Sequence, residues 1–190
     1  EMPFDDLKNY WPDTLMTNAR SWILGNVFDG VLSNFTVDFD IKPGEIDLVQ
    51  SGARPNAIDV DFSFRDATVN YFPEQPYAFG VDGEGHVDGA SLSMNMRDGT
   101  IENMYAPSGV ALITDLMLDS AMLTIIANVE GPADNAISLL DGPRFGYPSK
   151  MGLKGEQFSG HVIAEMGVQL PFRSDVTFEE VQFAAVARLD

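Results

Sequence analysis

Apolar and polar side chains alternate along most of the chain with a period of two residues. From Val31 to Ile41 the odd positions are apolar except Ser33, and the even positions include Asp38 and Asp40. Similar alternation occurs at residues 58–64, 92–96, 123–129, 162–170 and 181–189. Successive side chains of a strand point to opposite faces of a sheet, so each segment predicts a strand with one apolar and one polar face.

The alternation changes phase across Arg65-Asp66, which predicts a bulge or a tight turn inside that segment. Turn-forming pairs such as Asp88-Gly89 and Asp98-Gly99 separate the segments. About seven to ten strands at this short spacing are typical of an antiparallel all-β architecture.

Two segments have a helical period instead. One apolar helix face is formed by Leu15, Ala19, Trp22 and Ile23, and another by Ala133, Ala136, Ile137 and Leu140. Pro132 precedes the second helix, Gly142-Pro143 ends it, and a loop is expected from Pro143 to Gly155. We therefore expect one mainly β domain over residues 1–190 with two short helices at an open end or edge of the sheet.

Composition narrows the choice of function. The 190 residues include 29 acidic and 11 basic side chains, for a net charge of −18, which argues against binding nucleic acid or an anionic membrane surface. Cysteine is absent, so thiol chemistry and disulfides are excluded. The chain begins at Glu1, and its last alternation runs to the final residues, which suggests a segment excised from a longer protein.

Residues with catalytic or metal-binding chemistry are few. Glu84, His86 and Asp88 alternate along one strand and could converge on one face, but their spacing matches known metal motifs poorly. Ser159 and His161 lack the Gly-x-Ser-x-Gly context of a nucleophile elbow. A solvated polar face explains both sets, and no metal or cofactor is expected.

Two pairs of alternating carboxylates, Asp38/Asp40 and Asp59/Asp61, have a spacing that could serve a glycosidase. Because every predicted strand has acidic residues on its polar side, solvated charge is the simpler explanation. Hydrolysis is therefore the weakest of our functional hypotheses.

The 13 Phe and 9 Met residues indicate a large apolar face. It is either the core of an ordinary sandwich or a curved sheet whose face stays open as a groove for acyl chains. Each methylene removed from water contributes about 0.8 kcal/mol, so such a groove needs no catalytic group to hold a lipid. The residues expected to form this face are Phe35, Val37, Phe39, Val60, Phe62, Phe64, Leu92, Met94 and Met96.

Several segments, taken in order, resemble the AsmA-like superfamily and its YhdP-type branch in Gram-negative bacteria. They are Trp11-Pro12-Asp13, Asn18 to Ile23, Gly30-Val31-Leu32, Phe64 to Pro73, Gly83-Glu84-Gly85, Leu92-Ser93-Met94, Ser108-Gly109-Val110 with Asp115, Leu139-Leu140, and Gln169 to Phe172. The segments cover most of the chain. The resemblance depends more on the order in which they occur than on any single segment.

The resemblance implies a taco-like β-trough segment of a periplasmic protein that is anchored in the inner membrane by an N-terminal helix absent from this chain. It implies a non-enzymatic role in shielding phospholipids during transport between the inner and outer membranes. The expected partners are a phospholipid or other acyl-chain ligand and neighbouring β segments of the same polypeptide. The alternative is a structural or scaffolding β module of the envelope that holds no ligand and pairs through its sheet edges.

Overall fold

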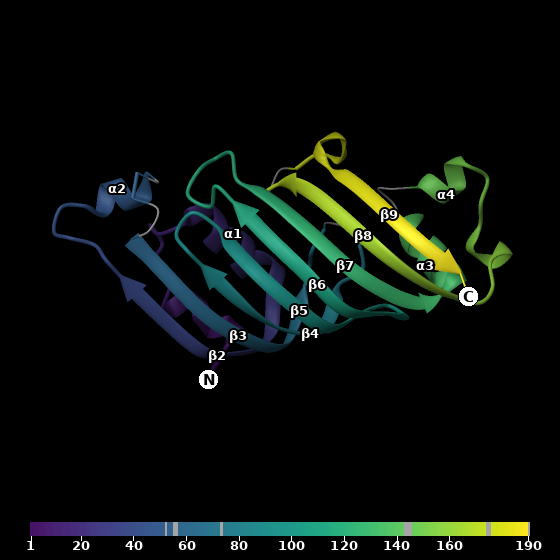
Figure 1. Ribbon diagram of the computed structural model, residues 1–190, viewed down its shortest axis with the longest axis horizontal. Coiled ribbons are helices and arrows are strands. Elements are labelled where there is room, and N and C mark those ends of the chain that lie inside the picture. The colour runs from purple at the N-terminus through teal and green to yellow at the C-terminus, as the bar shows by residue number, and fades with distance from the viewer. Residues whose placement is uncertain (52, 55–56, 73, 143–145, 174–175, 190) are drawn as a thin grey trace.

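Over the residues that it describes, the computed structural model shows one antiparallel sheet of nine strands, in which spatial order follows chain order from β1 to β9 (Figure 1). The structure describes residues 1–190 except 52, 55–56, 73, 143–145, 174–175 and 190. The strands are β1 (Met2–Pro3), β2 (Val27–Phe39), β3 (Ile58–Val69), β4 (Ala78–Val87), β5 (Leu92–Ile101), β6 (Met104–Thr114), β7 (Met122–Pro132), β8 (His161–Pro171) and β9 (Gln182–Leu189). The mainly β antiparallel fold predicted from the alternation is confirmed.

Short helices lie at the ends of the strands and over one face of the sheet. They are η1 (Phe4–Asn9), α1 (Thr17–Asn26), α2 (Ile46–Gln50), α3 (Ala133–Leu140), α4 (Tyr147–Lys150), η3 (Gly155–Gln157) and η4 (Phe178–Glu180). α1 and α3 correspond to the two predicted helices, and Pro132 directly precedes α3 as expected. The predicted loop after α3 contains α4, and η3 begins at its last residue, Gly155. Pro143, like Pro73 of the family-like segment, lies outside the described residues. Among the described residues, no helix is both long enough and apolar enough to cross a membrane.

The apolar face has a sealed row of side chains in register from β4 to β8. Its members are Val87, Leu92, Ile113, Leu123 and Leu170, each directly opposite the next across the strand pairs. All of them are buried, and they pack with Met16, Ala19 and Phe172 in one hydrophobic cluster. Residues around α1 therefore cover the place that a second sheet occupies in a sandwich.

A line of bulges crosses the strands and bends the sheet. Register shifts interrupt the pairing of β2 with β3, of β3 with β4, and of β6 with β7. Positive φ angles occur at Asp66 in β3, Gly80 in β4 and Asp98 in β5. Bulges increase local twist and bend a strand, so they account for the curved shape of the sheet in Figure 1. The bulge predicted at Arg65-Asp66 is confirmed.

One part of the predicted pattern in β2 is wrong. Leu32, not Val31 or Ser33, is the buried residue that pairs with Phe64, while Val31 lies opposite Arg65. The register shift between Ser33 and Thr36, with Asn34 at φ 50°, inserts an extra residue and reverses the alternation. The odd positions therefore face the apolar side only from Phe35 onward.

At Gly30 the bent β2–β3 pair leaves no room for a side chain. Its φ is +65°, and a Cβ there would lie 2.7 Å from the Arg65 carbonyl oxygen and 2.9 Å from Ala67 Cα. We predict that Gly30→Ala lowers the free energy of unfolding by about 3 kcal/mol or more, because left-handed strain and a backbone clash add together. Urea denaturation followed by circular dichroism measures the change.

Gly44→Ala is the matched control for this substitution. Gly44 also has a positive φ, +88°, but a Cβ there meets nothing within 4 Å. Its substitution should cost only about 1–2 kcal/mol, the strain alone. Equal losses for the two variants would contradict the close approach of β2 and β3 at Gly30.

Candidate functional site

An apolar groove of about 400 Å³ lies between the apolar face of the sheet and the N-terminal segment. Its floor is built from strands β2 to β8, and side chains of residues 4–23 line the opposite side. This volume is within the range of about 300–1,000 Å³ found for small-molecule sites. The groove is therefore a candidate binding site formed by one layer of sheet and one covering segment.

Two open rows of side chains form the centre of the groove floor. The first consists of Phe62, Gly85, Met94, Ala111, Ile125 and Val168, and the second of Phe64, Gly83, Met96, Gly109, Ala127 and Met166, each in cross-strand register. From β5 onward, Met94, Ile125 and Val168 in the first row and Met96, Ala127 and Met166 in the second are only half-buried. Apolar surface therefore stays accessible beside the sealed row.

Glycines of β4 provide space for two aromatic rings of β3. A Cβ on Gly85 would lie 2.3 Å from Cζ of Phe62, and one on Gly83 would lie 2.5 Å from Cζ of Phe64. The two rings must therefore lie directly over the β4 backbone, and their centroids are 6.2 Å apart. Rings that lie against the sheet occupy less of the groove than rings that stand upright on it.

The covering side of the groove comes from Trp11, Leu15, Trp22 and Ile23. The Trp11 indole N–H donates a hydrogen bond to the Leu15 carbonyl at 2.8 Å, so its polar atom is satisfied within the segment. Arg20 Nε donates to the Trp11 carbonyl at 3.0 Å. The Trp22 ring packs on Phe172, with centroids 5.2 Å apart. These contacts fix the segment while its apolar side chains face the groove.

All the residues predicted to form the apolar face line this groove. Phe64 and Leu92 are buried, with 4% and 2% of their surface exposed. Phe35 and Phe39 are exposed by 49% and 61%. Half-buried positions are held by Val37, Val60, Phe62, Met94 and Met96. Whether they contact a lipid remains a prediction, but the structure separates core positions from accessible ones.

The prediction omitted part of the lining. Ile125, Ala127, Met166 and Val168 also line the groove, and the alternation of β7 and β8 was the signal that could have identified them. The covering residues Leu15, Ala19, Trp22 and Ile23 were expected only to plug an end or edge, and Trp11 was noted only for its resemblance to the family. Their sequence shows an amphipathic helix, but not the face of the sheet on which it lies.

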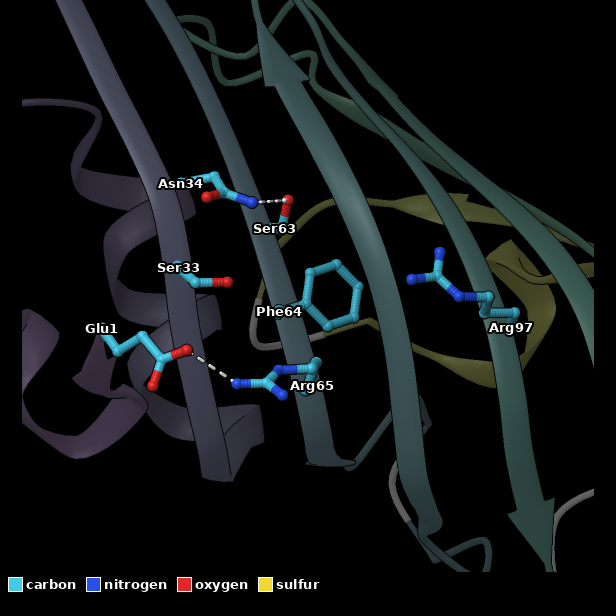
Figure 2. Close-up of a pocket in the computed structure, with 7 residues that line it drawn as sticks. All are labelled: Glu1, Ser33, Asn34, Ser63, Phe64, Arg65 and Arg97. Atoms are coloured by element: carbon cyan, nitrogen blue, oxygen red, sulfur yellow. Dashed lines mark hydrogen bonds and ion pairs between the residues drawn. The ribbon is translucent and has the colours of Figure 1, made fainter.

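A second hollow lies over β2 to β5 and is shown in Figure 2. Arg65 there is ion-paired with Glu1 at 2.8 Å, and Asn34 Nδ2 donates to Ser63 Oγ at 3.4 Å. Its lining also includes Ser33, Phe64 and Arg97. Because polar and charged groups dominate it, this hollow does not share the chemistry of the apolar groove.

Three of the residues singled out for chemistry, Ser159, Asp40 and Asp88, do not meet the partners that their sequence spacing suggested. Within the described chain no hydrogen bond joins Ser159 to His161. Asp40 is ion-paired with Arg54 at 3.1 Å. The side chain of Asp88 accepts hydrogen bonds from Ala90 N and from Ser91, instead of converging with His86 on one site.

Tyr71 is one of two tyrosines among the described lining residues, and the other, Tyr10, is 73% exposed. Burial, with a smaller effect of the Glu102 charge, raises the pKa of Tyr71 to about 12. The phenol is therefore neutral at physiological pH, and it adds no charge to the groove.

Substitutions of two strand glycines can test the packing of the groove floor. We predict that Gly85→Ala lowers the free energy of unfolding by about 1–3 kcal/mol, because the new methyl group collides with the Phe62 ring. Gly167→Ala in β8 is the control, since its nearest atom would be the Ala184 carbonyl oxygen at 4.0 Å. That variant should be neutral or slightly stabilised. Urea denaturation of both variants gives the comparison, and a harmless Gly85→Ala would contradict the ring placement.

An open, curved, single-layer antiparallel sheet with an apolar groove defines a β-trough domain. The chain belongs to the YhdP protein family, whose family model matches residues 3–183. This match confirms the resemblance noted in the sequence and indicates an AsmA-like protein of the Gram-negative envelope. The family is not known for enzymatic activity. Neither a curated protein sequence nor a solved structure shows significant similarity to the chain.

Proposed function

We propose that this domain is a non-enzymatic segment of an envelope protein that shields phospholipid acyl chains from water during their transport between the inner and outer membranes. The observation that carries the proposal is the pair of open rows, in which half-buried apolar side chains such as Met94, Ile125 and Met166 stay partly accessible inside a groove of about 400 Å³. We propose a periplasmic location, with anchoring in the inner membrane through another part of the full-length protein.

The chemistry of the groove supports an acyl chain as the ligand. Its lining is almost entirely aliphatic, aromatic and Met side chains, and Arg97 is the one basic residue among the described lining residues. Each methylene that leaves water for such a surface contributes about 0.8 kcal/mol, so a chain of several methylenes is held without specific polar contacts. Met94, Met96 and Met166 provide flexible thioether side chains that adapt to different tails.

The net charge of −18 supports the same role. A strongly acidic protein is repelled by anionic head groups, so it does not adhere to a membrane surface through its charge. Apolar contact with the tails then supplies the attraction, and the acidic exterior keeps the trough soluble.

A scaffolding module is the second candidate, and the exposed edge of β9 favours it. β9 pairs with β8 on one side and is the last strand in the sheet order. Val186 in this strand is 75% exposed. A free strand edge can pair with another β segment, so a scaffold would need no ligand in the groove.

Native mass spectrometry of the gently purified chain separates the two candidates. We expect adducts with phospholipid masses, and we expect a delipidated sample to take up phospholipid again from added detergent-solubilised lipid. A chain that acquires no lipid under either condition would exclude the shielding role and leave the scaffold.

Neighbouring isoleucines of β7 provide a matched pair of variants for this assay. Ile125 is half-buried in the groove floor, whereas Ile126 is 47% exposed on the other face of the sheet. We predict that Ile125→Asn weakens lipid binding by about tenfold or more, since it places a polar group against the acyl chain. Ile126→Asn should leave binding unchanged.

Circular dichroism and thermal unfolding check that Ile125→Asn still folds. If it does not, Phe35→Asn replaces it, because Phe35 lines the groove but is 49% exposed and so contributes less to the core. Equal lipid binding by the wild type, Phe35→Asn and Ile125→Asn proteins would show that the ligand lies elsewhere.

A further inference from the structure

His86 of β4 lies between two carboxylates of β3 on the polar face of the sheet. Its Nδ1 atom is 3.0 Å from Asp61 Oδ1, and its Nε2 atom is 3.9 Å from Asp59 Oδ2. Asp61 is directly opposite His86 in the β3–β4 pair, and Asp59 is on the same side two residues earlier. One ligand atom from each of the three residues lies within 4.8 Å of the others. The strand register, not their spacing along the sequence, brings them together.

The contact with Asp61 determines which ring nitrogen of His86 is available to bind a metal ion. An ionised carboxylate only accepts hydrogen bonds, so Nδ1 must donate its proton to Asp61 Oδ1. In the neutral imidazole this leaves an unprotonated Nε2 with its lone pair on the side of Asp59. A carboxylate that orients a histidine through one nitrogen while the other binds a metal is a recurrent arrangement in metalloproteins.

The distance between Nε2 and Asp59 suits a shared ion better than a hydrogen bond. At 3.9 Å the two atoms are too far apart to hydrogen-bond. Two ligands that each lie about 2.0–2.2 Å from one tetrahedral ion are about 3.3–3.6 Å apart, so Nε2 and Asp59 would have to approach each other slightly. The gap can therefore hold an ion with little movement of either side chain.

The surrounding charge also favours a cation. Asp38 is directly opposite Asp59 in the β2–β3 pair, and the charge of Asp88 also acts on His86. In the described part of the chain, neither Asp59 nor Asp61 is ion-paired with a lysine or an arginine, in contrast to Asp40 with Arg54. Among the described residues, His86 is thus the one basic side chain paired with Asp59 and Asp61.

We propose that His86 Nε2 and Asp59 bind a divalent transition-metal ion such as Zn²⁺, and that Asp61 orients the imidazole. Water completes the coordination, since all three side chains are exposed. An imidazole ligand favours Zn²⁺, Co²⁺ or Ni²⁺ over Mg²⁺ and Ca²⁺, which prefer oxygen ligands. The site is on the face opposite the groove, so the inference is independent of lipid binding.

Calorimetric titration of the whole chain with ZnCl₂ at neutral pH, in the presence of excess MgCl₂, tests the site. We expect saturable binding of one Zn²⁺ that Mg²⁺ does not displace. His86→Ala should abolish it, and Asp59→Asn should weaken it at least tenfold. Asp61→Asn, which removes only the orienting carboxylate, should weaken it by about 10- to 100-fold.

The other histidine of the chain is a matched control. His161 is exposed at the start of β8, and His161→Ala should bind Zn²⁺ like the wild type. In NMR spectra, Zn²⁺ should shift the imidazole resonances of His86 and leave those of His161 unchanged. Because His86 is an exposed side chain, its variant should keep the wild-type thermal unfolding temperature.

Three results would overturn the proposal. The first is the absence of saturable Zn²⁺ binding, and the second is equal binding by the wild type and His86→Ala. The third is displacement of Zn²⁺ by Mg²⁺ at similar concentrations, which would mean that the acidic surface attracts cations without a defined site.

Discussion

The main constraint on this structure is hydrophobic burial. The apolar face of its single sheet must be kept away from water, and in the described part of the chain no second sheet covers it. The segment around α1 meets this need only in part. It seals the row formed by Val87, Leu92, Ile113, Leu123 and Leu170, in a cluster that includes Met16 and Ala19. The segment covers the open rows beside it only in part. The groove is the space above these rows that no side chain of the core fills.

Bulges and glycines determine the shape of this incomplete core. Left-handed residues in β2 to β5 bend the strands at related positions, so the sheet curves as one unit. Gly83 and Gly85 allow the rings of Phe64 and Phe62 to lie over β4. Curvature of the sheet creates space above its apolar face. Because the two rings lie against the sheet, they leave that space free. The same aromatic residues in an ordinary sandwich would meet side chains of an opposing layer.

Much of this architecture could be predicted because the period of two is a local property of the sequence. It identified β2, β3, β5, β7, β8 and β9, the apolar positions of β3, β5, β7 and β8, and the phase change at Arg65-Asp66, but it did not mark β1 or β6. It failed before Phe35, since the bulge at Asn34 leaves no comparable mark in the sequence. Cross-strand relations were also out of reach: His86 meets Asp61 and Asp59 because of the β3–β4 register, whereas sequence spacing suggested Glu84 and Asp88.

The sequential strand order has a consequence for how the domain unfolds. Each of β2 to β8 is hydrogen-bonded to the strands immediately before and after it in the chain. The free energy of such an array is close to a sum over adjacent pairs, as in repeat proteins. Opening then proceeds inward from its margins, at the two-residue β1 and at β9, which has a single neighbour. The interior ladders from β3 to β7 should be the last to exchange their amide protons with solvent.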